Sequence, residues 1–122
     1  MKIRINGDSV RIRLSQSEIS TFVYRGEIVS SCRFMNDTLF YKLKHGNYSE
    51  LSADFSQNTI AVYVPEEWIL NWDKDDRVGF EGKKDNGLHI LIEKDYQCLK
   101  PRLNEDESDL FSNPQSSVSS YD

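Results

Sequence analysis

Cysteine and histidine are scarce in this sequence of 122 residues, which contains two of each. Cys32 and Cys98 lie far apart without a C-x-x-C pair, and His45 and His89 form no H-E-x-x-H motif. We therefore predict no metal site and no cofactor. Two such thiols are expected to be reduced in the cytoplasm, although their number allows one disulfide.

The sequence also lacks an apolar run of about 20 residues, the length that a membrane span requires. Residues 1–7 alternate charged and apolar side chains, unlike the apolar core of a signal peptide. We expect a cytoplasmic protein without a membrane partner. A net charge of −5 and a pI of about 5.0 argue against nucleic acid as a partner.

Motifs for covalent or phosphate chemistry are absent, since there is neither a glycine-rich phosphate loop nor a G-x-S-x-G motif. The sequence therefore predicts no catalytic residue. The charge is uneven, because residues 1–44 contain eight Lys and Arg against four Asp and Glu, whereas residues 45–122 contain seven against sixteen. Any anion-binding surface is expected in the first third of the chain.

Residues 2–14 predict a β-hairpin with one aliphatic face and one cationic face. Basic and apolar side chains alternate in residues 2–5 and again in residues 10–14. Between these runs, Asn6 and Gly7 tolerate the positive φ angles that a tight hairpin turn requires.

A helix over residues 16–25 is expected directly after the hairpin. Ser15 and Glu18 have the spacing of a capping box at its start. Gly26 suits the left-handed residue at its end. The apolar stripe of this helix is expected to pack on the sheet.

Six further segments alternate apolar and polar side chains, as strands do. They are residues 27–35, 38–44, 48–55, 59–64, 77–82 and 88–96. Because their connections are short, we predict an α+β fold built on a curved antiparallel sheet or partial barrel of about seven to eight strands. One amphipathic helix follows the first hairpin, and a second short helix contains Trp68 and Trp72.

The predicted domain covers residues 1–103, and an acidic, serine-rich tail follows over residues 104–122. The tail has a net charge of −5 and too few apolar side chains to offset the entropy lost on ordering, so we expect it to be mostly disordered. Leu110 and Phe111 are its candidate anchors. They are also the candidate docking residues for a basic groove on a partner.

The cationic hairpin face is the main candidate site, because crowded cations repel one another unless an anion lies nearby. Arginine also suits phosphate and carboxylate, which its planar fork can bind with two hydrogen bonds. Three interpretations stay open: an external phosphate-bearing ligand or acidic peptide, a solvated surface, or an internal partner from residues 73–76 or 105–109. The candidate ligand-binding residues are Lys2, Arg4, Arg11, Arg13, Arg33, Lys42 and Lys44.

The two ends of the chain carry distinctive motifs. The chain opens with Met-Lys-Ile-Arg-Ile-x-Gly-x-Ser-Val-Arg-Ile-Arg-Leu-Ser-Gln-Ser-Glu, and it later reads Cys-Leu-Lys-Pro-Arg-x-x-Glu-Asp-Glu-Ser-Asp-x-Phe-x-Asn-Pro. Over about residues 1–114 it resembles a family of small uncharacterised bacterial proteins, a domain of unknown function. The resemblance implies a bacterial cytoplasmic setting and brings no activity and no catalytic residue.

The sequence favours a non-catalytic binding or adaptor module that uses the basic face for an anionic ligand or acidic peptide. The alternative is a phosphoester or polyphosphate hydrolase similar to the triphosphate-tunnel enzymes, although Lys-Ile-Arg-Ile departs from their opening Glu-x-Glu-x-Lys. For the hydrolase, the metal-binding carboxylates would come from Glu50, Asp54, Glu81 or Glu93. A third hypothesis is self-association, in which the acidic tail of one copy occupies the basic face of another.

Overall fold

The computed structural model describes residues 1–83, 87–97 and 108–112, which form eight strands, one α-helix and one 3-10 helix. The strands are β1 (Lys2–Ile5), β2 (Ser9–Leu14), β3 (Glu27–Arg33), β4 (Thr38–Gly46), β5 (Ser52–Ser56), β6 (Thr59–Pro65), β7 (Gly79–Lys83) and β8 (His89–Lys94). The helices are α1 (Gln16–Arg25) and the 3-10 helix η1 (Glu66–Ile69).

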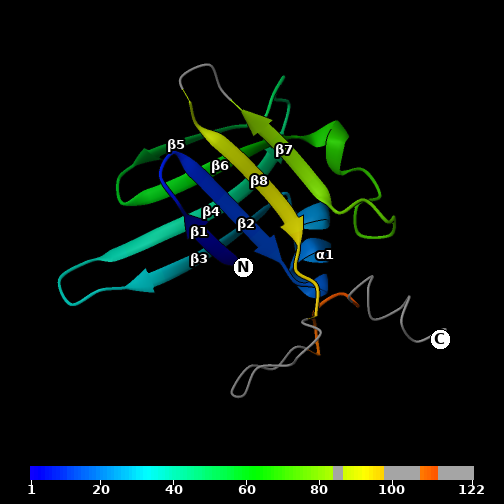
Figure 1. The fold of residues 1–122 in the computed structure, drawn as a ribbon, viewed down its shortest axis with the longest axis horizontal. Helices are drawn as coiled ribbons and strands as arrows, with labels where there is room; N and C mark the ends of the chain where they lie inside the picture. Colours follow the sequence, from blue (N-terminus) through cyan, green and yellow to red (C-terminus); the bar gives the residue numbers. More distant parts are fainter. Residues whose placement is uncertain (84–86, 98–107, 113–122) are drawn as a thin grey trace.

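These strands form two four-stranded sheets that share one pattern of pairing. The first sheet has the order β1-β2-β8-β7, and the second has the order β3-β4-β6-β5. In each sheet the outer pairs are antiparallel, whereas the central pair, β2 with β8 or β4 with β6, is parallel. Figure 1 shows the first sheet in front of the second, with the strands of the two sheets crossing in the view.

The predicted α+β class, the eight strands and the helix after the first hairpin are confirmed. The sheet differs from the expected curved antiparallel one, because the strands of the described residues divide into two mixed sheets and form no closed barrel. Alternation identifies a strand but not its partner. Hairpin neighbours are local in sequence, whereas β2 and β8 are separated by the whole second sheet, so their parallel pairing left no short-range signal.

The two sheets and α1 share one hydrophobic core. Ile12 and Ile92 reach it from the first sheet, Leu43 from the second and Phe22 from α1, and all four are fully buried. Burying one such side chain contributes about 1.5–3 kcal/mol. The outward sides of the strands are therefore free to carry charge.

The local signals at the hairpin turn and the helix ends are confirmed. Gly7 in the first turn and Gly26 after α1 adopt positive φ angles of 57° and 87°. At the start of α1, the Ser15 Oγ accepts from the Glu18 N–H at 3.4 Å, and the Ser15 N–H donates to the Glu18 carboxylate at 2.9 Å. This capping box fixes where the chain leaves β2.

The second short helix is the 3-10 helix η1, which contains Trp68 and ends before Trp72. Trp72 is fully buried, and its indole Nε1 donates a hydrogen bond to the Arg77 carbonyl at 2.9 Å. It therefore closes one end of the core. Among the described residues, no helix is long and apolar enough to cross a membrane.

Part of the predicted tail packs on the domain. Residues 108–112 lie against β8 and the start of α1, where the Gln16 N–H donates to the Asp109 carbonyl at 3.0 Å. The boundary at residue 103, residues 104–107 and 113–122, and Cys98 lie outside the described residues. Cys32 is an exposed free thiol.

Candidate functional site

The outward face of the first sheet carries the cationic side chains predicted from the hairpin. In the register of β1 and β2, Lys2 lies opposite Arg13, and Arg4 lies opposite Arg11. Directly opposed residues in an antiparallel pair have Cβ atoms about 4.5–5.5 Å apart, and like charges at these positions are destabilising. The backbone therefore holds two like-charged pairs side by side.

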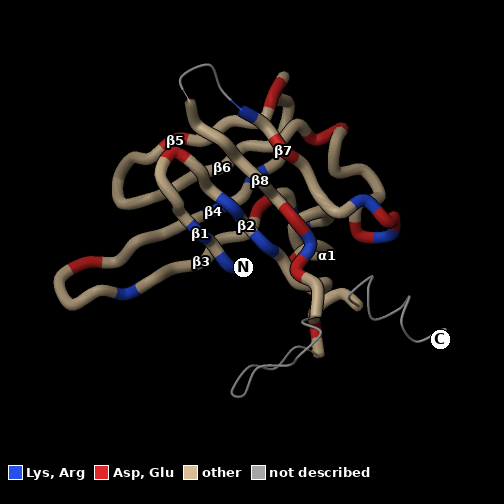
Figure 2. The backbone as a smooth tube through the Cα atoms, in the orientation of Figure 1, with Lys and Arg blue, Asp and Glu red and all other residues tan. Residues whose placement is uncertain are grey.

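These four cations line one shallow hollow of about 190 Å³, together with Ile3. Figure 2 shows the basic positions of β1 and β2 next to each other on the front of the molecule. The apolar residues that alternate with them, Val10, Ile12 and Leu14, are buried in the core. The alternation that predicts the hairpin also places its charges on one side.

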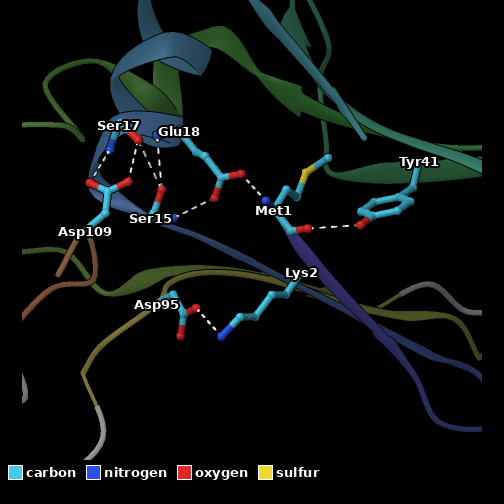
Figure 3. Close-up of polar contacts among 8 residues, drawn as sticks. All are labelled: Met1, Lys2, Ser15, Ser17, Glu18, Tyr41, Asp95 and Asp109. Atoms are coloured by element: carbon cyan, nitrogen blue, oxygen red, sulfur yellow. Dashed lines mark hydrogen bonds and ion pairs between the residues drawn. The ribbon is translucent and has the colours of Figure 1, made fainter. Parts of the chain in front are cut away.

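Two carboxylates at the end of β8 neutralise part of this charge. The Glu93 carboxylate accepts a hydrogen bond from the Arg11 Nε and lies 3.9 Å from the Arg13 Nε. The Asp95 carboxylate, which is largely buried, lies 3.0 Å from the Lys2 Nζ (Figure 3). The hairpin cations therefore have an internal partner, but it is neither of the two segments considered from the sequence, because the parallel pairing of β2 with β8 supplies it.

Neither acidic segment considered as the internal partner contacts the hairpin cations among the described residues. In the loop of residues 73–76, the Asp75 carboxylate lies 2.7 Å from the Arg77 guanidinium and 4.0 Å from the Lys94 Nζ. In the tail, the Asp109 carboxylate accepts a hydrogen bond from the Ser17 hydroxyl at 2.5 Å. This contact lowers the pKa of Asp109.

Arg4 has the greatest freedom to bind a ligand. Its side chain is exposed, and no carboxylate partner is found for it among residues 1–83, 87–97 and 108–112. The hollow thus combines four cations with two carboxylates at its side. An excess of positive charge stays available to an anion.

The N-terminal residue fixes the edge strand that carries Lys2 and Arg4. The Met1 amino group forms an ion pair with the Glu18 carboxylate, and the Tyr41 hydroxyl donates to the Met1 carbonyl at 3.0 Å (Figure 3). Burial by itself raises the pKa of Glu18, but hydrogen bonds from the amino group and from Ser15 outweigh it, and the pKa is lowered. These contacts join β1 to α1 and to the second sheet.

The other three candidate cations lie in the second sheet and do not line the hollow. Arg33 is exposed at the end of β3. Lys42 and Lys44 lie on β4, where the Lys42 Nζ is 3.5 Å from the Glu27 carboxylate. The sequence shows that these residues are basic, but their sheet depends on strand pairing that periodicity does not reveal.

The candidate docking residues of the tail face their own domain. Phe111 forms a β-bridge with Tyr96, and the two ring centroids are 5.6 Å apart. The Lys94 Nζ lies 5.2 Å from the centroid of the Phe111 ring. The Leu110 carbonyl accepts a hydrogen bond from the Gln16 side chain at 3.1 Å. We name residues 108–112 the C-terminal clasp.

The carboxylates considered for a hydrolase divide between the two sheets, and the two that line one hollow, Glu81 and Glu93, each have another partner. Asp54 lies in β5 of the second sheet, whereas the Glu81 carboxylate accepts from His89 Nε2 at 2.5 Å and Glu93 pairs with Arg11. Glu50 precedes β5. Within the described part of the chain, no group of three or more His, Cys, Asp and Glu residues is arranged to hold a metal ion.

Sequence reasoning missed Glu93 and Asp95 as partners of the hairpin cations. Alternation along residues 88–96 places positions 93 and 95 on one side of the chain. The alternation therefore indicates that the two carboxylates point to the same side of their strand. It does not show which strand lies beside them.

Comparison with known proteins gives one match. Residues 1–115 match a family model described as "Family of unknown function (DUF7009)", in agreement with the resemblance seen in the sequence. No curated protein and no solved structure matches the chain.

Proposed function

The chain belongs to this family of unknown function, and we propose that it is a binding module for a small phosphate-bearing ligand. The supporting observation is the hollow of the first sheet, in which Lys2, Arg4, Arg11 and Arg13 come together from two neighbouring strands. An anion between the two opposed like-charged pairs relieves their repulsion.

The dimensions of the hollow favour a phosphoryl group over a larger anion. Its volume of about 190 Å³ is smaller than the ~300–1,000 Å³ of typical small-molecule pockets. It can accommodate a phosphate or pyrophosphate and leaves the rest of a larger ligand in solvent. Arginine forks bind such groups with paired, charge-assisted hydrogen bonds.

The neighbouring carboxylates set how strong this binding can be. Glu93 and Asp95 already hold Arg11 and Lys2, so an incoming anion competes with them for part of the charge. Arg4 is not engaged in this way and should contribute most per residue. Because the site is open, its affinity should fall as the salt concentration rises.

Isothermal titration calorimetry with pyrophosphate and triphosphate at low ionic strength tests this proposal. We expect binding by the wild-type chain and a loss of about tenfold to a hundredfold in affinity in Arg4→Gln, because a hydrogen bond to a charged group is worth about 1.5–3 kcal/mol. Arg33→Gln is the matched control, since it removes the same charge from the second sheet.

The proposal is wrong if neither anion binds, or if Arg33→Gln weakens binding as much as Arg4→Gln does. Thermal denaturation of each variant in the absence of ligand separates a lost contact from a lost fold. Arg4 is exposed, so its replacement should leave the unfolding temperature nearly unchanged.

A further inference from the structure

A second hollow, of about 540 Å³, lies between α1, β4 and the segment that begins with η1. This volume lies within the ~300–1,000 Å³ of small-molecule pockets. Its apolar wall includes Val23 from α1 and Ile69 and Leu70 from η1 and the next residue. Leu70 is 65% exposed and Tyr24 is 67% exposed, so a ligand would cover apolar surface that water now covers.

The charge of this hollow is opposite to that of the basic one. Glu66, Glu67 and Asp73 line it, and no lysine or arginine of residues 1–83, 87–97 and 108–112 does. No ion-pair partner is found for these three carboxylates among the residues that the structure describes. Within the described residues, the hollow therefore has three carboxylates without an ion pair beside an apolar wall, and Lys94 interacts with one of them, Asp73, only at longer range.

His45 lines the same hollow and has defined contacts on its side facing α1. Its Nε2 atom lies 3.3 Å from the Val23 carbonyl and its ring packs edge-to-face on Phe22 with centroids 5.2 Å apart. Its Nδ1 atom is buried and has no hydrogen-bond partner in the described part of the chain. Because Nδ1 has no accessible surface, it lies behind the wall of the hollow, and His45 contributes the edge of a ring held in place by Val23 and Phe22.

We propose that this hollow binds a small organic cation, namely an ammonium group on an apolar chain. The carboxylates attract the ammonium group, the apolar wall covers the chain, and the ring of Tyr24 offers a face to the cation. The ammonium N–H groups are donors, and the carboxylate oxygens accept from them. This site does not depend on the proposed anion site, because the two hollows share no residue.

Hexylammonium and hexanoate are a matched pair of probes, since they have the same apolar chain and opposite charges. We expect hexylammonium to shift the amide NMR signals of residues 23, 24 and 70 in the full chain with a millimolar Kd, whereas hexanoate leaves these signals unchanged. The double variant Glu67→Gln/Asp73→Asn should weaken hexylammonium binding by about fivefold to tenfold. Glu27→Gln, which removes a carboxylate from β3, should have no effect.

Equal binding of hexanoate, or no shift with hexylammonium at about 50 mM, would overturn this proposal. A second variant, Val23→Phe, narrows the hollow and leaves its carboxylates in place. It should abolish the hexylammonium shifts while pyrophosphate still binds the basic hollow. If Val23→Phe binds hexylammonium as the wild type does, the ammonium is attracted only by surface charge and the hollow is not its site.

Discussion

The two sheets have the same pairing pattern and opposite outward faces. Each consists of two antiparallel pairs joined by a central parallel pair. The outward face of the first sheet is lined with opposed cations, whereas that of the second exposes Val29 and Phe40 beside Lys42. The two sheets therefore share a backbone arrangement, and they differ in the chemistry of the side chains that point outward.

The inward faces of the two sheets, in contrast, are alike and share one core. Leu14 from β2 and Leu43 from β4 are both fully buried in one core cluster. Neither sheet can keep these side chains from water without the other. The sheets should therefore unfold together, although their outward faces differ in chemistry.

Replacing Leu14 or Leu43 by alanine has the largest expected effect on stability. It tests whether the two sheets contribute equally to the core. Each change should lower the free energy of unfolding by about 2–5 kcal/mol, through lost burial and a cavity. Urea unfolding followed by tryptophan fluorescence measures this. Val29→Ala, at an exposed position of β3, is the control and should change stability by less than about 1 kcal/mol. Two separate transitions in either leucine variant would refute the shared core.

The Phe111→Ala variant tests a second difference between the sheets, because the contacts of the C-terminal clasp within the described residues are to α1 and to the end of the first sheet. Phe111 is partly buried against Tyr96 and over Lys94, so its removal should cost about 2 kcal/mol, less than removal of a fully buried phenylalanine. Hydrogen exchange should become faster in β8 and in the first turn of α1. Phe55→Ala, at a 69% exposed position of the second sheet, is the matched control. Equal acceleration in both sheets would contradict this role of the clasp.

The Glu18→Gln variant has the smallest expected effect and tests the contacts that hold β1 against α1. The pKa of Glu18 is lowered in the folded protein from its ordinary value near 4.5. The stabilisation from its charge is therefore present above about pH 4.5 and is lost as the pH falls through the folded pKa.

Glutamine can still accept the Ser15 N–H hydrogen bond, so the variant removes the charge and keeps the capping box. Urea unfolding should show the wild type more stable by about 1 kcal/mol or less at pH 7 and equal to the variant near pH 3. A difference that persists at pH 3 would show that the charge is not responsible. Glu27→Gln, which loses an exposed ion pair with Lys42, is the control for a general charge effect.

Most of the local structure could be predicted from the sequence, because its signals lie within a few residues of one another. The turn at Gly7, the capping box of Ser15 and Glu18, and the end of α1 at Gly26 all follow from side-chain chemistry and backbone freedom. The four hairpin cations share a face for the same reason, since alternation over a few residues fixes their direction.

The contacts between distant segments could not be predicted in this way. Pairing of β2 with β8 brings Glu93 to Arg11, and pairing of β4 with β6 keeps Lys42 in the other sheet. Both pairings bury the apolar faces of the strands, but many other strand pairings would bury these faces equally well. The sequence identifies Phe111 as a candidate anchor. Its contact with Tyr96 could not be predicted, because it depends on where β8 ends.

We propose that the first sheet binds an anion and that the second sheet does not, although both carry basic residues. Titration of the ¹⁵N-labelled chain with pyrophosphate, followed by amide NMR, tests this most directly. We predict shifts that saturate in residues 2–5 and 9–14, with residues 33, 42 and 44 unchanged. Shifts centred on residues 33, 42 and 44, or none in the first hairpin, would contradict the account.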